Sequence, residues 1–176
     1  LSHSEHQFLA VGEADQQEQT VDALIQNWPA QNITKSARLE LPSTRQQSRQ
    51  LWVCNSQVNF CAKAYPTVPV GHADAASLTV LAGVLRNGFL HTAIREQGGA
   101  YGGGASQDSM NAAFRFYSYR DPRLSDTLND FDQSIAWVLE TQHEWRVIEE
   151  AILGVVSSLD KPSSPAGTAK QHFHDA

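Results

Sequence analysis

One glycine-rich segment carries the residues best suited to chemistry, Leu90 to Ala105 (LHTAIREQGGAYGGGA). It holds a single tyrosine, Tyr101, six residues after an arginine, Arg95. A phenol and a guanidinium both donate hydrogen bonds, so together they could stabilise a negatively charged oxygen without first gaining or losing a proton. Glycines bracket the tyrosine at a density that weakens a strand and usually marks the close approach of another backbone. These candidate contact positions are Gly98, Gly99, Gly102, Gly103 and Gly104.

The same segment has two other interpretations. A phosphate-binding loop would need a lysine followed by serine or threonine after the glycines, or a G-x-G-x-x-G register, and the sequence has neither. A purely structural role stays open on the residues alone. Arg95 could complement the dipole at the end of a short helix, and Tyr101 could be a half-buried sheet residue.

Periodicity in the sequence predicts the elements that position this segment. Apolar residues at helical spacing predict helices over 18–30, 73–87, 124–141 and 144–159, and a shorter one over 89–97. The shorter helix is expected to end at Gly98 in the left-handed conformation. Alternating or apolar runs predict strands over 7–12, 37–41, part of 50–65 and 112–120. This order predicts an α+β fold: a two-layer sandwich in one domain over 1–176, with helices covering one face of a mainly antiparallel sheet.

Composition excludes several classes of function. The net charge is −6, and lysine and arginine are scattered, so the basic stripe of a nucleic-acid-binding protein is missing. No apolar run is long enough to cross a bilayer, and the first residues lack a secretory signal, so we expect a soluble protein with no membrane partner. A bacterial cytoplasm and an organelle matrix are both compatible with this. Because the only methionine is Met110, we expect the chain to be part of a longer protein.

The cysteines and histidines do not predict a metal site. Cys54 and Cys61 lie in a strand-like stretch, so we expect two reduced, buried thiols, with a disulfide between them as the alternative. No histidine stands in an H-E-x-x-H or H-x-x-E-H motif. The histidines near the ends of the chain have the spacing of no closed site and are expected to be solvated. They are His3, His6, His172 and His174.

Four stretches of the sequence together resemble one known family. They are IREQGGAYGGGA, FRFYSYRDP, LTVLAGVLRNGFLHTAIRE and QFLAVGEADQQEQTVDALIQNW. Over roughly Gln7 to Gly167 the chain is similar to the C-terminal-half domain of the presequence-protease branch of the insulinase/pitrilysin zinc metallopeptidases. The resemblance implies two homologous halves that close around an unfolded peptide. Zinc would be bound by H-x-x-E-H in the N-terminal half of the same polypeptide, and this chain would hold none.

The resemblance also implies roles for particular residues. Arg95 and Tyr101 match the arginine and tyrosine that the non-zinc half contributes to catalysis, and the five glycines would keep a strand edge open for an extended peptide. The isolated chain is then expected to be inactive, and an uncovered apolar face could let it form a homo-oligomer. A non-catalytic scaffold or binding domain of the same fold is the alternative. A serine hydrolase is disfavoured because no G-x-S-x-G motif occurs.

The segment Ser118 to Pro122 (SYRDP) belongs to the same resemblance. Its residues suit a turn from a strand into a helix. Asp121 can accept backbone hydrogen bonds or cap the helix, as Ser125 also could, and Pro122 can open it. Arg120 is the residue of this segment that we expect at an interface.

Overall fold

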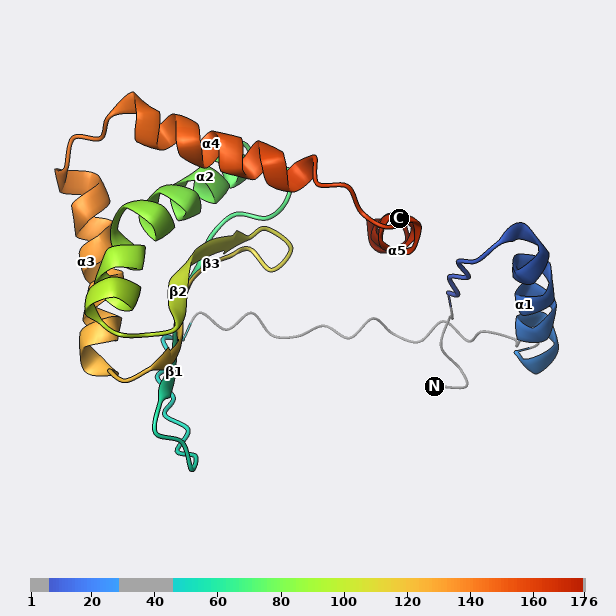
Figure 1. Ribbon diagram of the computed structural model, residues 1–176, viewed down its shortest axis with the longest axis horizontal. Helices are drawn as coiled ribbons and strands as arrows, with labels where there is room; N and C mark the ends of the chain where they lie inside the picture. Colours follow the sequence, from blue (N-terminus) through green and yellow to red (C-terminus); the bar gives the residue numbers. More distant parts are fainter. Residues whose placement is uncertain (1–6, 29–45, 176) are drawn as a thin grey trace. The chain divides into compact units, whose positions relative to one another are not determined.

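The glycine-rich segment leads into a three-stranded antiparallel sheet in the computed structural model, which describes residues 7–28 and 46–175 (Figure 1). The strands are β1 (Asn59–Pro66), β2 (Gly102–Asp108) and β3 (Ala113–Asp121), in the order β1-β3-β2. A tight turn joins β2 to β3, where the Asp108 carboxylate accepts hydrogen bonds from the backbone and side chain of Asn111. The strand predicted over 112–120 is confirmed. β1 is shorter than the predicted segment, because residues 50–58 form no strand.

Helices cover one face of this sheet, which confirms the α+β class (Figure 1). The helix α2 (Ala75–Leu85) continues without a break into η1 (Arg86–Gln97), a π-helix, and both pack on β2. After β3 come α3 (Ser125–Glu140), which packs on η1 and β1, and α4 (Trp145–Leu159), which packs along α2. The chain therefore stays helical through Gly88, without the break between the helices predicted over 73–87 and 89–97. A Cβ at this position would lie 2.4 Å from the Trp137 ring, so the glycine allows α3 to approach closely.

Alternation along β3 decides which side chains are buried. Phe114, Phe116 and Ser118 face the helices and are buried, whereas Arg115, Tyr117 and Tyr119 are exposed or partly exposed on the other face. Phe116 packs on Phe131 of α3, with the ring centroids 5.6 Å apart and the rings tilted by 30°. The largest fully buried apolar side chains also include Leu85, Leu90 and Ile94, so α2 and η1 supply much of the core behind the glycine-rich segment.

The chain divides into two compact units, Trp52–Lys161 and a second made of Leu1–Leu51 with Pro162–Ala176. The described part of the second unit holds α1 (Ala14–Asn27) and α5 (Pro165–Asp175). α1 begins earlier than predicted, α5 was not predicted, and residues 7–12 form no strand, because a strand needs a partner to complete its hydrogen bonds. The strand predicted at 37–41 lies outside the described residues. A single domain over 1–176 stays a prediction.

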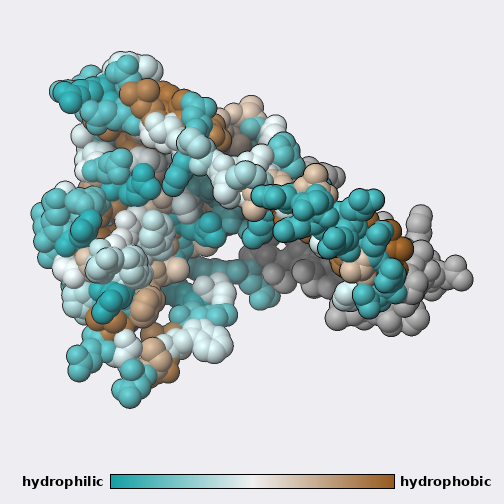
Figure 2. Space-filling model, turned by 45° about the vertical axis from the view of Figure 1, so that its right-hand side comes forward, coloured by the Kyte–Doolittle hydropathy of each residue, from teal (hydrophilic) through white to brown (hydrophobic). Residues whose placement is uncertain are grey.

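Some apolar side chains lie uncovered on the surface. On α4, Leu153 and Leu159 are 58% and 78% exposed, and hydrophobic side chains are visible near the top of Figure 2, where this helix lies. Self-association through such a face stays a prediction. None of the helices in the described ranges has both the length and the apolar character needed to span a bilayer.

The two cysteines are free thiols in different surroundings. Cys61 is buried on β1, with its Sγ 3.9 Å from the carbonyl oxygen of Arg123, whereas Cys54 is exposed. The predicted burial of Cys54 is wrong because residues 50–58 do not join the sheet. Burial raises the pKa of the Cys61 thiol above its usual value, so this thiol stays protonated and unreactive at neutral pH.

Alkylation distinguishes the two thiols. At about pH 8, iodoacetamide should modify Cys54 within minutes and Cys61 only after unfolding, because the thiolate is the reacting form. Mass spectrometry of the digested protein measures both rates, and Cys54→Ser provides the single-thiol control. Equal rates in the folded protein would contradict the burial of Cys61.

Candidate functional site

Arg95 and Tyr101 both point away from the core. Arg95 lies in the last turn of η1 and is exposed, and among the described residues its guanidinium has no hydrogen-bond or ion-pair partner. Tyr101 directly precedes β2 and is 65% exposed, and its hydroxyl likewise has no partner within the described parts of the chain. Both side chains are therefore free to contact a ligand.

Backbone hydrogen bonds fix the turn between these two residues. The N–H of Gly99 donates to the carbonyl oxygen of Arg95 (3.2 Å), and the N–H of Ala100 donates to that of Ile94 (3.1 Å). The N–H of Tyr101 donates to the carbonyl oxygen of Arg120 in β3 at 3.4 Å. The turn is thus tied to the end of η1 on one side and to β3 on the other.

The left-handed residue of this turn is Gly99, with φ 76°, and not Gly98 as predicted. η1 ends at Gln97, as predicted, but its C-cap residue Gly98 keeps a helical backbone, with φ −79°, so the left-handed conformation falls one residue later. A residue with a Cβ is disfavoured at such a positive φ, so Gly99 is needed for the turn itself.

An aromatic pair holds the Tyr101 ring. The ring centroids of Tyr101 and Tyr119 are 5.3 Å apart, and the two rings are tilted by 57°. Tyr119 lies opposite Gly102 in the β2–β3 register, and a Cβ on Gly102 would stand 2.7 Å from the Tyr119 ring. Gly102 thus makes room for the ring against which Tyr101 packs.

The remaining glycines also have reasons inside the domain. A Cβ at Gly103 would lie 2.8 Å from the Ile94 side chain, and one at Gly104 would lie 2.9 Å from the aliphatic part of Arg86. A Cβ at Gly98 would lie 1.8 Å from Nη2 of Arg123. Close packing therefore accounts for these glycines without a ligand. Their role in peptide binding stays a prediction, and β2 is an edge strand of the sheet that the described residues form.

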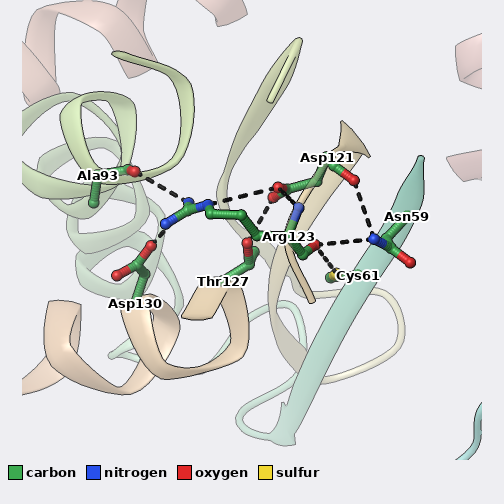
Figure 3. Close-up of polar contacts among 7 residues, drawn as sticks. All are labelled: Asn59, Cys61, Ala93, Asp121, Arg123, Thr127 and Asp130. Atoms are coloured by element: carbon green, nitrogen blue, oxygen red, sulfur yellow. Dashed lines mark hydrogen bonds and ion pairs between the residues drawn. The ribbon is translucent and has the colours of Figure 1, made fainter. Parts of the chain in front are cut away.

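Arg123 connects the sheet to the helix that carries Arg95 (Figure 3). Its Nη2 donates to the carbonyl oxygen of Ala93 in η1 (3.2 Å) and lies 3.1 Å from Oδ2 of Asp130, an ion pair without hydrogen-bond geometry. Its Nε lies 3.8 Å from Oδ1 of Asp121. A residue of the loop after β3 thereby holds the C-terminal part of η1.

Asp121 is the buried centre of this network. Its side chain is fully buried, and its carboxylate accepts hydrogen bonds from the backbone N–H of Arg123 (2.9 Å) and from the hydroxyl of Thr127 (2.7 Å). Asp121 therefore accepts a backbone hydrogen bond, as predicted. Neither Asp121 nor Ser125 caps α3, because the N-cap residue is Leu124 and no side chain caps the helix.

Sequence reasoning missed Arg123 and Tyr119. Both act through residues that are distant in the chain, Gly98 and Ala93 for Arg123, and Tyr101 for Tyr119. The alternation along β3 does indicate that Tyr119 shares a face with the strand position opposite. No local pattern identifies Arg123.

The structure groups no candidate metal ligands in the parts of the chain that it describes. Within residues 7–28 and 46–175, no three side chains of histidine, cysteine, aspartate or glutamate lie close enough to hold a metal ion together.

The contact between Gly98 and Arg123 can be tested by a double-mutant cycle. Gly98→Ala should lower the free energy of unfolding by about 1–3 kcal/mol, because its methyl group overlaps the guanidinium and the Ile94 carbonyl oxygen. In an Arg123→Ala background the same change should cost less, by about 0.5 kcal/mol or more. Denaturant unfolding measures all four proteins.

A second glycine is the matched control. Gly154→Ala in α4 should raise stability by about 0.5–1 kcal/mol, because its methyl group meets no atom within 4 Å and alanine favours a helix. Equal costs of Gly98→Ala in both backgrounds would show that Arg123 does not require the glycine.

Comparison with known proteins identifies the family. A family model described as the PreP C-terminal domain matches residues 49–174. A protein named mitochondrial presequence protease from Xenopus laevis is 43% identical over 116 residues, which is 66% of this chain and 11% of that protein. Proteins of the same name from Drosophila melanogaster and Emericella nidulans are 43% and 33% identical, over 72% and 86% of this chain.

This chain spans only a small part of those relatives, 12% of the Drosophila protein and 15% of the Emericella protein. The family model begins at residue 49, later than the resemblance read from the sequence, and ends beyond Gly167. Within that range lie Arg95, Tyr101 and the whole sheet. The chain belongs to the PreP C-terminal domain family, which confirms its resemblance to the presequence-protease branch of the insulinase/pitrilysin superfamily.

Proposed function

We propose that the chain acts as the C-terminal-half domain of a zinc-dependent endopeptidase that degrades unstructured peptides in a closed chamber. Its partners are the N-terminal half of the same polypeptide, which holds the zinc ion, and the peptide. Relatives named as presequence proteases support a peptidase. The domain supplies Arg95 and Tyr101 as hydrogen-bond donors and no zinc ligand.

One observation carries this proposal: the two donors are exposed and unpartnered within the described residues, although their backbones are fixed. Arg95 is held by η1 and by the hydrogen bond from Gly99, and Tyr101 by Arg120 and by the ring of Tyr119. Donors held in place before the substrate arrives stabilise developing charge without a reorganisation cost during the reaction. The guanidinium of Arg123, which supports the fold, is by contrast paired with Asp121 and Asp130.

The chemistry requires donors outside the shell of the metal. When bound, zinc activates a water molecule and polarises the carbonyl group of the peptide bond. Attack on that bond places negative charge on the carbonyl oxygen, and the Tyr101 hydroxyl and the Arg95 guanidinium donate hydrogen bonds to it. In this role the outer edge of β2, with Gly102, Gly103 and Gly104, pairs with the extended peptide through main-chain hydrogen bonds.

Removal of the Tyr101 hydroxyl tests the catalytic role. In the full-length peptidase, Tyr101→Phe should lower kcat/KM by about tenfold to a thousandfold, the loss expected for one oxyanion donor. Tyr119→Phe is the matched control, because it removes a neighbouring hydroxyl and keeps the ring that packs on Tyr101. An unchanged rate for Tyr101→Phe would favour a scaffold or binding domain.

Metal content tests the division between the two halves. The full-length protein should hold about one zinc ion per chain, whereas the 176-residue chain alone should hold far less. Elemental analysis after gel filtration measures both. Stoichiometric, tightly held zinc in the chain alone would contradict the assignment of the metal to the N-terminal half.

A further inference from the structure

Arg120 has an unusual backbone conformation inside β3. Its φ is 51°, and in the described parts of the chain only Ala112 (φ 50°), in the turn before β3, is another non-glycine residue with positive φ. This left-handed region suits glycine, and asparagine tolerates it better than most residues. Such strained residues persist where the surrounding structure fixes them, and they often lie at functional sites.

The strain comes from a β-bulge. Phe60 of β1 pairs with Tyr119 and Asn59 pairs with Asp121, so Arg120 is an extra residue with no partner in β1. By alternation, residue 120 would face the helices and Asp121 would face solvent. The bulge reverses this, so that Arg120 is exposed and Asp121 is fully buried. Bulges redirect side chains in this way next to active sites.

The bulge alone does not require an arginine. Burial of Asp121 needs an extra residue with a left-handed backbone, and glycine would provide it with less strain. The positive φ at position 120 disfavours any residue with a Cβ, and yet the residue there is an arginine. The guanidinium is therefore the feature that needs an explanation.

Arg120 is also a direct neighbour of the proposed active site. Its carbonyl oxygen accepts the hydrogen bond from the Tyr101 N–H at 3.4 Å. Its guanidinium has no ion-pair or hydrogen-bond partner in the described ranges, whereas Arg115 and Arg123 of the same hairpin and its following loop pair with aspartates. Among the residues that the structure describes, the guanidinium of Arg120 is thus an unpaired positive charge, on a chain whose net charge is −6.

We propose that Arg120 is a substrate-binding residue that pairs with a carboxylate of the peptide beside Tyr101. This rests on the proposed peptidase function. A guanidinium binds a carboxylate through two parallel hydrogen bonds, a geometry that a lysine cannot reproduce. The carboxylate is either an acidic side chain or the C-terminus of the peptide, and Arg120 sets a preference for peptides that present it.

The test uses substitutions that the bulge accepts. Arg120→Asn and Arg120→Gly both suit a positive φ and remove the charge, so the full-length peptidase should stay folded. The substrates are three matched peptides: one with an internal glutamate and a free C-terminus, one with glutamine in its place, and one with an amidated C-terminus. Steady-state kinetics give kcat and KM for each.

We expect both variants to raise KM by about tenfold to a hundredfold for the peptide with both carboxylates, with little change in kcat. For the peptide that lacks the recognised carboxylate, wild type and variants should have the same KM. Whether this is the glutamine peptide or the amidated peptide identifies the carboxylate that Arg120 binds. Arg120→Lys should restore part of the affinity. A KM that does not change, or that changes equally for all three peptides, would overturn the proposal.

Two controls separate charge, backbone and active-site effects. Ala112→Gly relaxes the other left-handed residue, and Arg146→Gln removes a distant surface charge that pairs with Glu150, so both should leave KM unchanged. Tyr101→Phe in the same assay distinguishes the two proposals. If it slows hydrolysis and Arg120→Asn has no effect, only the role of Arg120 fails. If Tyr101→Phe also has no effect, the proposed function fails.

Discussion

The burial of the Asp121 carboxylate is the constraint on which the site depends. An ionised group removed from water is tolerated only when it is paired and hydrogen-bonded. Here Arg123 provides both a backbone N–H and a guanidinium, and Thr127 adds a hydroxyl. Because the same guanidinium also donates to Ala93, the pairing of Asp121 fixes η1 against the end of β3. The position of Arg95 thus depends on a contact between Ala93, in the same segment, and Arg123, which lies outside that segment.

The same carboxylate explains the irregular end of β3. A strand with regular alternation would point Asp121 toward solvent, and the bulge at Arg120 turns it inward. The left-handed backbone of a non-glycine residue costs roughly 1–2 kcal/mol. The inward-turned carboxylate accepts hydrogen bonds from the Arg123 N–H and the Thr127 hydroxyl, and these offset that cost. The bulge also places the carbonyl oxygen of Arg120 where the Tyr101 N–H can reach it. The buried Asp121 carboxylate therefore positions both Arg95, at the end of η1, and Tyr101, directly before β2.

Local patterns in the sequence predicted the regular parts of this unit and missed its contacts. β3, α3 and α4 were predicted because their alternation or helical spacing extends over nine residues or more. The start of β1 was not predicted, because residues 50–58 are apolar enough for a strand but do not form one. The left-handed residue was placed at Gly98 and not at Gly99, since either of two adjacent glycines can adopt that conformation. Arg123 and Tyr119 could not be found, because their roles depend on packing between segments.

The glycines of β2 suit both close packing inside the domain and an open strand edge for a peptide, and sequence alone cannot separate these two reasons. On the open face, the space beside Gly102 is filled by the Tyr119 ring, and the space beside Gly104 by the aliphatic part of Arg86. On the opposite face, Gly103 admits Ile94. These three glycines carry no side chains, but side chains of other residues cover both faces of the strand at their positions. In the proposed role, an extended peptide would therefore reach the main chain of β2 along its unpaired outer edge, where hydrogen bonds to the backbone do not depend on the sequence of the peptide. Selectivity would have to come from side chains near the edge, and Arg95, Tyr101 and Arg120 are exposed residues around the turn that precedes it.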